Sequence, residues 1–160
     1  MFESNIHHEV HVAHVLRGDG ACGRGLHGHT WQVDLRLCAP DVDVMGALIG
    51  PEFTTNLRAW LEEHVNYVVL LAAADRLVHP LGADQGHRLF RFNAPDPRSG
   101  EDLAVDLPAP SAELVALLIA RAGEKELARL PAVAGVAVDR VQITQGSQVV
   151  ARWRCAPDAK

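Results

Sequence analysis

The order of apolar and polar positions predicts a strand hairpin at the start of the chain. Residues 5–16 alternate between the two kinds, are rich in valine and histidine, and end before Arg17-Gly-Asp-Gly. Residues 30–37 alternate in the same way, and the glycine-rich segment 18–28 connects the two runs. Because a period of two puts every second side chain on one face of a strand, we expect these runs to pair antiparallel.

A second hairpin and two helices complete the predicted fold. Residues 136–144 and 148–155 alternate on either side of Gly146-Ser147, which is typical of a closing hairpin. Apolar residues recur at helical spacing after Pro51 and again after Ser111, a candidate N-cap. The pattern therefore predicts an α+β fold: a four-stranded antiparallel sheet with two helices packed on one face, in the order strand-strand-helix-helix-strand-strand.

The chain is expected to form one domain, residues 1–160, because 160 residues with 48% apolar content suffice for a single core. Residues 79–109 form a long polar stretch, which we interpret as an insert. Inside it we expect a short hairpin of residues 89–92 with residues 103–107. Long ordered segments are often functional, so the insert is a candidate lid or oligomer contact, with surface decoration as the alternative.

The composition excludes several classes of partner. A net charge of −5 at pH 7 and an aromatic content of 5% argue against a nucleic-acid surface. No apolar run is long enough to span a bilayer, so we expect no membrane partner. The three cysteines, Cys22, Cys38 and Cys155, are an odd number in a chain without a signal-like start. This predicts a cytoplasmic protein with reduced thiols.

His27 and His29 are the clearest candidates for a functional site. They are two residues apart at the start of an alternating strand, so their imidazoles are expected to project to one side. His14 closes the first alternating run on the face of its apolar residues and is a candidate third member. Three neutral imidazoles form a catalytic zinc set, because a tetrahedral ion with three protein ligands keeps one position open. The alternative is that His27 and His29 are surface residues beside a glycine turn.

These histidines, with Cys22 shortly before His27-Gly-His29 and an aromatic strand after it, resemble the zinc site of the 6-pyruvoyl-tetrahydropterin synthase and 6-carboxy-tetrahydropterin synthase family. The resemblance spans most of the chain and implies the tunnelling fold (T-fold) with Zn²⁺ as cofactor. It implies His14, His27 and His29 as the zinc ligands, and Cys22 as the general base. A cation beside that thiol, zinc or Arg24, would lower its pKa, and Arg24 is also a candidate substrate-binding residue. The alternative for Cys22 is a small buried hydrophobic residue.

The family uses an aspartate-histidine pair in proton transfer, and the chain departs from it. Leu70-Leu71 and the residues that follow match the family pattern, which places Asn66 and Tyr67 at the positions of the pair. Asn66 cannot exchange a proton, whereas Tyr67 can donate a hydrogen bond or, with a pKa of about 10, a proton. The alternative for Tyr67 is a half-buried core aromatic. A shift of three residues offers Glu63 and His64 instead, but it moves the leucines out of line.

A second departure concerns the glutamate with which the family anchors its pterin. The equivalent position on the third strand of the family is Gln145 here. A carboxylate accepts two hydrogen bonds from the guanidine-like edge of a pterin, whereas an amide has one acceptor oxygen. We therefore expect Gln145 to contact the substrate but to hold a pterin less tightly. The metal-binding residues match the family, and the substrate-handling residues do not.

The resemblance implies a zinc-dependent enzyme of carbon-oxygen lyase type whose small-molecule substrate has diverged. Two alternatives stay open: a ring-closing amine-aldehyde condensation enzyme of a specialised biosynthetic pathway, and a catalytically silent zinc-containing binding protein. The family joins its sheets into a trimeric barrel with active sites between subunits, which implies a homotrimer or homohexamer. An isolated sheet also leaves two edges and one face that need cover.

Overall fold

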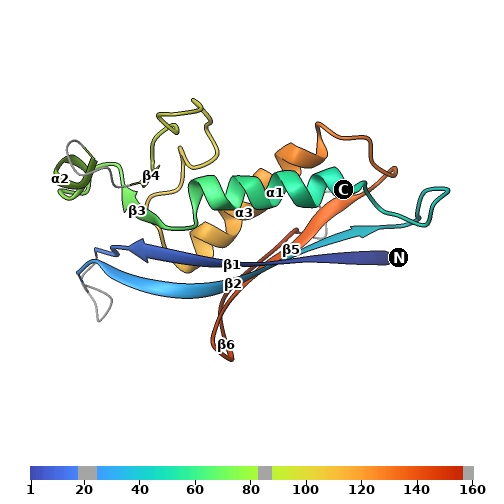
Figure 1. Ribbon diagram of the computed structural model, residues 1–160, viewed down its shortest axis with the longest axis horizontal. Helices are drawn as coiled ribbons and strands as arrows, with labels where there is room; N and C mark the ends of the chain where they lie inside the picture. Colours follow the sequence, from blue (N-terminus) through green and yellow to red (C-terminus); the bar gives the residue numbers. More distant parts are fainter. Residues whose placement is uncertain (18–24, 83–87, 157–160) are drawn as a thin grey trace.

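The structure is a computed structural model that describes residues 1–17, 25–82 and 88–156 (Figure 1). Within these residues the strands are β1 (Phe2–His14), β2 (His27–Ala39), β3 (Val68–Ala72), β4 (Leu89–Phe92), β5 (Ala137–Gln145) and β6 (Gln148–Arg154). The helices are α1 (Pro51–His64), α2 (Val78–Gly82) and α3 (Ala112–Leu127). The six strands form one sheet in the order β4-β3-β1-β2-β5-β6.

The two predicted hairpins form the centre and one side of this sheet. β1 pairs antiparallel with β2 along its whole length, from Phe2 opposite Ala39 to His14 opposite His27. β5 pairs antiparallel with both β2 and β6. These four strands are the sheet that the alternating pattern predicted.

The prediction of four strands and of the order strand-strand-helix-helix-strand-strand is wrong, because β3 and β4 extend the sheet beyond β1. Both pair in parallel: Val12 of β1 lies opposite Val68, and Leu70 of β3 lies opposite Phe90. The short apolar run of β3 has no alternation because it is buried among neighbouring strands and helices, as parallel strands usually are. The described order is ββαβαβαββ, which makes the sheet mixed.

The expected hairpin of residues 89–92 with residues 103–107 is also wrong. β4 pairs with β3, and residues 103–106 form turns, joined to the strand end by one backbone bond from Asn93 N to Ala104 O of 2.9 Å. Phe90, Phe92, Ala104 and Leu107 are buried in the main core. That residues 79–109 are an insert stays a prediction, but the described part of this segment is not mere surface decoration.

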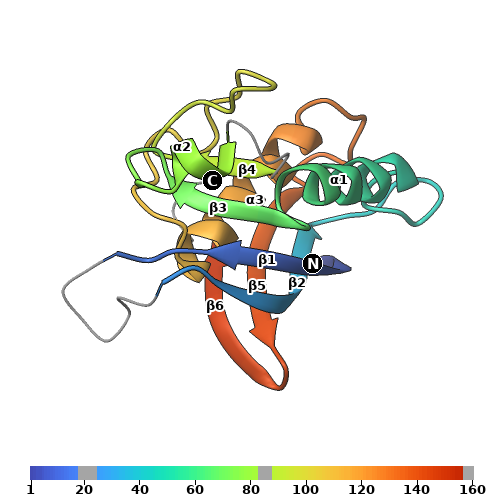
Figure 2. The same ribbon diagram turned by 60° about the vertical axis from the view of Figure 1, so that its left-hand side comes forward.

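The two long helices cover one face of the sheet, as predicted (Figures 1 and 2). α1 begins at Pro51, and α3 begins after Ser111, whose side chain accepts a hydrogen bond from Leu114 N. α3 lies close to the sheet at Gly123, where an added Cβ would be 2.9 Å from a methyl group of Leu35. Within the described residues, no helix combines the length and the apolar content needed to cross a lipid bilayer.

The opposite face of the sheet is polar, and its edges are incompletely covered within one chain. On that face Arg36 of β2 forms ion pairs with Glu3 of β1 and Asp139 of β5. β3 pairs only with residues 12–14 of β1, so in the described residues the rest of that edge has no neighbouring strand. β6 forms the other edge of the sheet.

Candidate metal centre

The register of the first hairpin brings three histidines together. His14 lies directly opposite His27, and His29 follows two residues later on the same face of β2. One nitrogen or another of each ring lies within 4.8 Å of the other two, and the Nε2 atoms of His14 and His29 are 3.1 Å apart. His27 and His29, two residues apart on β2, thus meet His14 at the end of β1, as their spacing in the sequence predicted.

Backbone carbonyl groups fix the orientation of two of these rings. The Nδ1 atom of His14 is 2.7 Å from the oxygen of Pro110, and Nδ1 of His27 is 2.8 Å from the oxygen of Gly25. Because a carbonyl oxygen only accepts, each Nδ1 carries the proton, which leaves Nε2 with a lone pair. Histidines that bind metals commonly donate their second nitrogen in this way.

Burial favours the neutral form of His14 and His29. Desolvation lowers the pKa of His14, as do His27 and His29, against the opposing effect of the Pro110 carbonyl. Desolvation and the neighbouring His27 likewise lower the pKa of His29, while a hydrogen bond with the Gln145 side chain opposes the shift. Three imidazoles whose nitrogens converge in this way fit a zinc ion, which binds histidine nitrogen at about 2.0–2.1 Å.

Trp31 is the packing platform of the cluster, a role that the sequence did not reveal. Its ring stacks on His29 with a centroid distance of 5.3 Å and stands edge-on to His14 at 5.5 Å. Trp31 is 1% exposed, so both histidine rings rest against a fixed surface. The signal in the sequence was the aromatic residue two positions after His29. The carbonyl groups of Gly25 and Pro110 left no such signal.

The side chain of Gln145 lies close enough to His29 to raise the pKa of that ring, against the larger effects that lower it. Gln145 is the last residue of β5 and is exposed, so its amide is accessible beside the histidines. The position is compatible with contact to a molecule bound at the metal. Its role in substrate binding stays a prediction.

Asn66 and Tyr67 contact a different part of the chain. Asn66 is buried, accepts a hydrogen bond from His11 N at 2.7 Å and donates to a carboxylate oxygen of Glu62 at 2.8 Å. Tyr67 has a φ of +52° and is 69% exposed, with its ring 5.1 Å from that of His11. Since His11 and His14 lie on opposite faces of β1, Tyr67 is on the far side from the cluster of its own chain. The catalytic roles of both residues stay predictions and require the cluster of another subunit.

The alternative pair, Glu63 and His64, does not lie together at the cluster either. His64 is buried, with Nδ1 3.0 Å from the carbonyl oxygen of Trp60 and Nε2 3.2 Å from a carboxylate oxygen of Asp96. Both ring nitrogens of His64 therefore already have hydrogen-bond partners, one within α1 and one at Asp96. Glu63 is exposed on the helix surface. Cys22 and Arg24 lie outside the described residues, so their roles also stay predictions.

The fold and the site together define a class: an α+β protein with a three-histidine centre at the end of its first hairpin. The sequence model of 6-pyruvoyl tetrahydropterin synthase matches residues 4–155. The chain belongs to the 6-pyruvoyl tetrahydropterin synthase family.

Solved structures with the same fold are distant in sequence. An uncharacterized protein from Wolinella succinogenes is similar with a TM-score of 0.68 at 14% identity, over 97% of this chain and 98% of that one. A catalytic-residue mutant of the 6-pyruvoyltetrahydropterin synthase of Plasmodium vivax has a TM-score of 0.62 at 14% identity, over 97% and 100%. The enzyme of Plasmodium falciparum has a TM-score of 0.59 at 11% identity, over 96% and 99%. No curated protein matches the chain.

Proposed function

We propose that this protein is a zinc-dependent enzyme of lyase type that acts on a small molecule other than the pterin substrate of its family. The observation that supports this most directly is the convergence of the three histidine rings, with two Nδ1 protons held by backbone carbonyls. Such a donor set suits a catalytic zinc ion, because three ligands leave one position open. Zinc at this position would act as a Lewis acid toward a substrate carbonyl or hydroxyl oxygen.

The side chains around the centre would orient the substrate and move its proton. Gln145 beside His29 can both donate and accept hydrogen bonds, so it would orient a polar group of the substrate. Cys22, which four residues separate from His27-Gly-His29 in the sequence, is the proposed base, and Arg24 would favour its thiolate form. Buried Trp31 would exclude water from the side of the cluster that faces the core.

The proposed change of substrate rests on three residues that differ from the family pattern. Gln145 offers one acceptor oxygen where the family carboxylate offers two. Asn66 uses its amide to join β1 to Glu62, which is a structural role. Tyr67 offers a phenol hydroxyl in place of a histidine imidazole. Each change weakens either pterin binding or proton transfer.

We also propose that the cytoplasmic protein is a homotrimer or homohexamer with its active sites between subunits. In the described residues, Phe2–Val10 of β1 and the whole of β6 are edges, whereas the backbone of His11 already bonds Asn66 and Tyr67. Edges with unpaired backbone groups readily pair with another chain. Pairing them between copies would cover both edges and enclose the polar face. Tyr67 lies on the far side of the sheet from the histidines of its own chain, so it would have to act at the histidines of another copy.

Zinc analysis tests the metal site. We expect about one zinc per chain in the purified protein and none in the double variant His27→Ala/His29→Ala. The matched control is His7→Ala/His11→Ala, which removes two histidines from the opposite face of β1 and should keep the metal. Metal-free native protein after growth with zinc, or full occupancy in the first double variant, would contradict the site.

Activity with and without metal tests the enzyme class. The native protein and a chelated sample would be incubated with a panel of pterins and simple hydroxy-carbonyl compounds, and products followed by mass spectrometry. Product formation that stops on chelation and returns with added zinc supports the proposal. Zinc-replete protein that binds members of the panel without converting any would favour the silent binding protein instead.

A further inference from the structure

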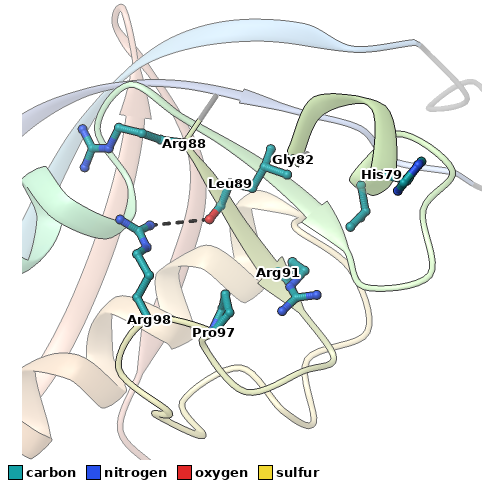
Figure 3. Close-up of a pocket in the computed structure, with 8 residues that line it drawn as sticks. His79, Gly82, Arg88, Leu89, Arg91, Pro97 and Arg98 are labelled. Carbon is teal, nitrogen blue, oxygen red and sulfur yellow. Dashed lines mark hydrogen bonds between the residues drawn. The ribbon is translucent and has the colours of Figure 1, made fainter. Parts of the chain in front are cut away.

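An open pocket of about 640 Å³ lies apart from the metal centre, at the β4 edge of the sheet. It is enclosed by α2, by the outward side of β4 and by the loop at Pro97-Arg98 (Figure 3). Volumes of this size are typical of small-molecule sites. The pocket involves none of the residues that the family resemblance assigned to catalysis, metal or substrate.

The sheet separates this pocket from the three histidines. His14 lies opposite Leu70 on β3, and Leu70 lies opposite Phe90 on β4, so these three side chains share the core face. Leu89 and Arg91 alternate with Phe90 and therefore project to the other face. A molecule in the pocket would not contact the metal centre of the same chain.

The pocket concentrates positive charge in a protein whose net charge is −5. Arg88, Arg91 and Arg98 all line it, together with His79, and no acidic side chain is among the described residues that do so. Arg88 donates to the carbonyl oxygens of Glu62 and Glu63, each at 2.6 Å, so its charge is fixed at the end of α1. Arg88 therefore adds positive electrostatic potential to the pocket, but its N–H groups are already used in hydrogen bonds to the backbone.

Arg91 and Arg98 are the residues with donors to offer. Within the described residues, neither guanidinium lies within ion-pair distance of a carboxylate, and Arg98 makes a single long bond of 3.5 Å to the Leu89 carbonyl. Figure 3 shows the Arg98 side chain directed from the loop at the Leu89 carbonyl, and Arg91 two residues after Leu89 on β4. The guanidinium group presents paired donors that match the oxygens of phosphate and carboxylate groups.

The loop that carries Arg98 is held in place from the core. Asp96 is 3% exposed, and its carboxylate accepts hydrogen bonds from Arg98 N at 3.1 Å and from the Ser99 hydroxyl at 2.8 Å. The same carboxylate lies 3.2 Å from Nε2 of His64. A buried network thus positions the backbone of Arg98, which reduces the entropy lost when its side chain binds a ligand.

We propose that this pocket binds a small organic anion, a phosphate or carboxylate group attached to an apolar body. Arg91 and Arg98 would bind the anionic group, with Arg88 adding attraction. Val78, Leu89 and Pro97 supply apolar walls that would contact the rest of the molecule. The site is independent of the proposed function at the histidines.

Calorimetric titration of the full-length protein with phenyl phosphate tests the proposal. We expect one site per chain, and a loss of affinity of about tenfold or more in Arg91→Gln and in Arg98→Gln, since each removes a charge-assisted contact. The matched control is Arg76→Gln, which removes the same charge from an exposed neighbour outside the pocket and should change affinity by less than about twofold. Melting temperatures within a few degrees of native would show that the variants are folded.

Three outcomes would overturn the proposal. One is the absence of binding at millimolar phenyl phosphate, and another is an equal loss in Arg76→Gln, which would indicate only general electrostatic attraction. The third is loss of binding in His27→Ala/His29→Ala, which would place the anion at the metal centre.

Inorganic phosphate should bind more weakly than phenyl phosphate, and equal affinities would contradict the proposed contact of an apolar body with the walls of the pocket. If Arg98→Gln does not fold, Arg91→Gln and Arg91→Lys decide the matter, with the lysine variant expected to retain more affinity than the glutamine variant.

Discussion

The Nδ1–H group of His14 donates a hydrogen bond of 2.7 Å to the carbonyl oxygen of Pro110, 96 residues away in the sequence. His14 ends β1, and Pro110 comes directly before Ser111, the N-cap of α3. One contact therefore links the start of the second long helix to the orientation of a metal-binding ring. The cap of α3 and the geometry of the centre are consequently coupled.

Replacing Ser111 with alanine should therefore affect stability and metal binding together. The variant loses the bond from Leu114 N to the Ser111 hydroxyl, and N-cap losses of this kind cost about 0.5–2 kcal/mol of unfolding free energy. Zinc affinity should also fall, because Pro110 would be held less firmly. Urea unfolding of the metal-free protein and a zinc titration measure the two effects. Ser147→Ala, in the exposed β5–β6 turn, is the control and should change neither.

Turnover of dihydroneopterin triphosphate, the family substrate that the resemblance implies, should be far below ordinary enzymatic rates. A lost charge-assisted contact at Gln145 costs roughly 1.5–3 kcal/mol of binding, and a lost proton-transfer partner costs about 100-fold or more in rate. Gln145→Glu should tighten pterin binding without restoring turnover, because the residues at Asn66 and Tyr67 are unchanged. Product formation by the zinc-loaded native protein near ~10 per second would show that the alignment at Asn66 or Gln145 is wrong.

The sequence was sufficient for the elements whose period is local. Alternation identified the strands that became β1, β2, β5 and β6, and the capping residue Ser111 identified the start of α3. β2 (His27–Ala39) is longer at both ends than the predicted run, whereas β1 (Phe2–His14) begins earlier than predicted but ends two residues sooner, where its pairing with β2 ends. The histidines were predictable because their spacing relative to the strand period fixes the side on which they project.

The sequence was not sufficient where pairing is between distant segments. β3 and β4 are short, and their partners are distant in the sequence. Val68 of β3 pairs with Val12, 56 residues earlier, and Leu70 pairs with Phe90, 20 residues later. Nothing local distinguishes Val68–Leu71 from a buried helix turn. Tyr67 illustrates the same limit: its left-handed backbone and its exposure on the other face of the sheet from the histidines of its own chain could not be predicted locally, and its catalytic role stays a prediction.

Light scattering should report a trimer or hexamer at micromolar concentration. In the described residues, β6 and the part of β1 before His11 have no neighbouring strand on one side. A strand from another chain could pair with the backbone groups of these edges. Arg152→Pro on β6 should shift the mass toward the monomer, because proline removes a donor and fits poorly in a paired strand. Arg152→Ala is the control, because it loses the same side-chain hydrogen bonds to Gln142 but keeps the backbone N–H, and it should leave the native mass unchanged. A native protein that is monomeric at this concentration would contradict the proposed assembly.

Asp96→Asn should lower stability in a manner that depends on pH. Burial raises the pKa of Asp96, but the hydrogen bonds from Arg98 N and the Ser99 hydroxyl, with the charges of His64 and Arg98, outweigh it and leave the pKa below its usual value. A depressed carboxyl pKa stabilises the folded state above the unfolded value of about 3.9, and this contribution is lost as pH falls through the folded value. We expect the native protein to exceed the variant by about 1–3 kcal/mol at pH 6–7. Urea unfolding should show this difference shrinking below about pH 4, whereas Asp102→Asn, at an exposed position of the same segment, should stay within about 0.5 kcal/mol of native throughout. A difference that is constant from neutral to acid pH would mean that the charge of Asp96 does not stabilise the fold.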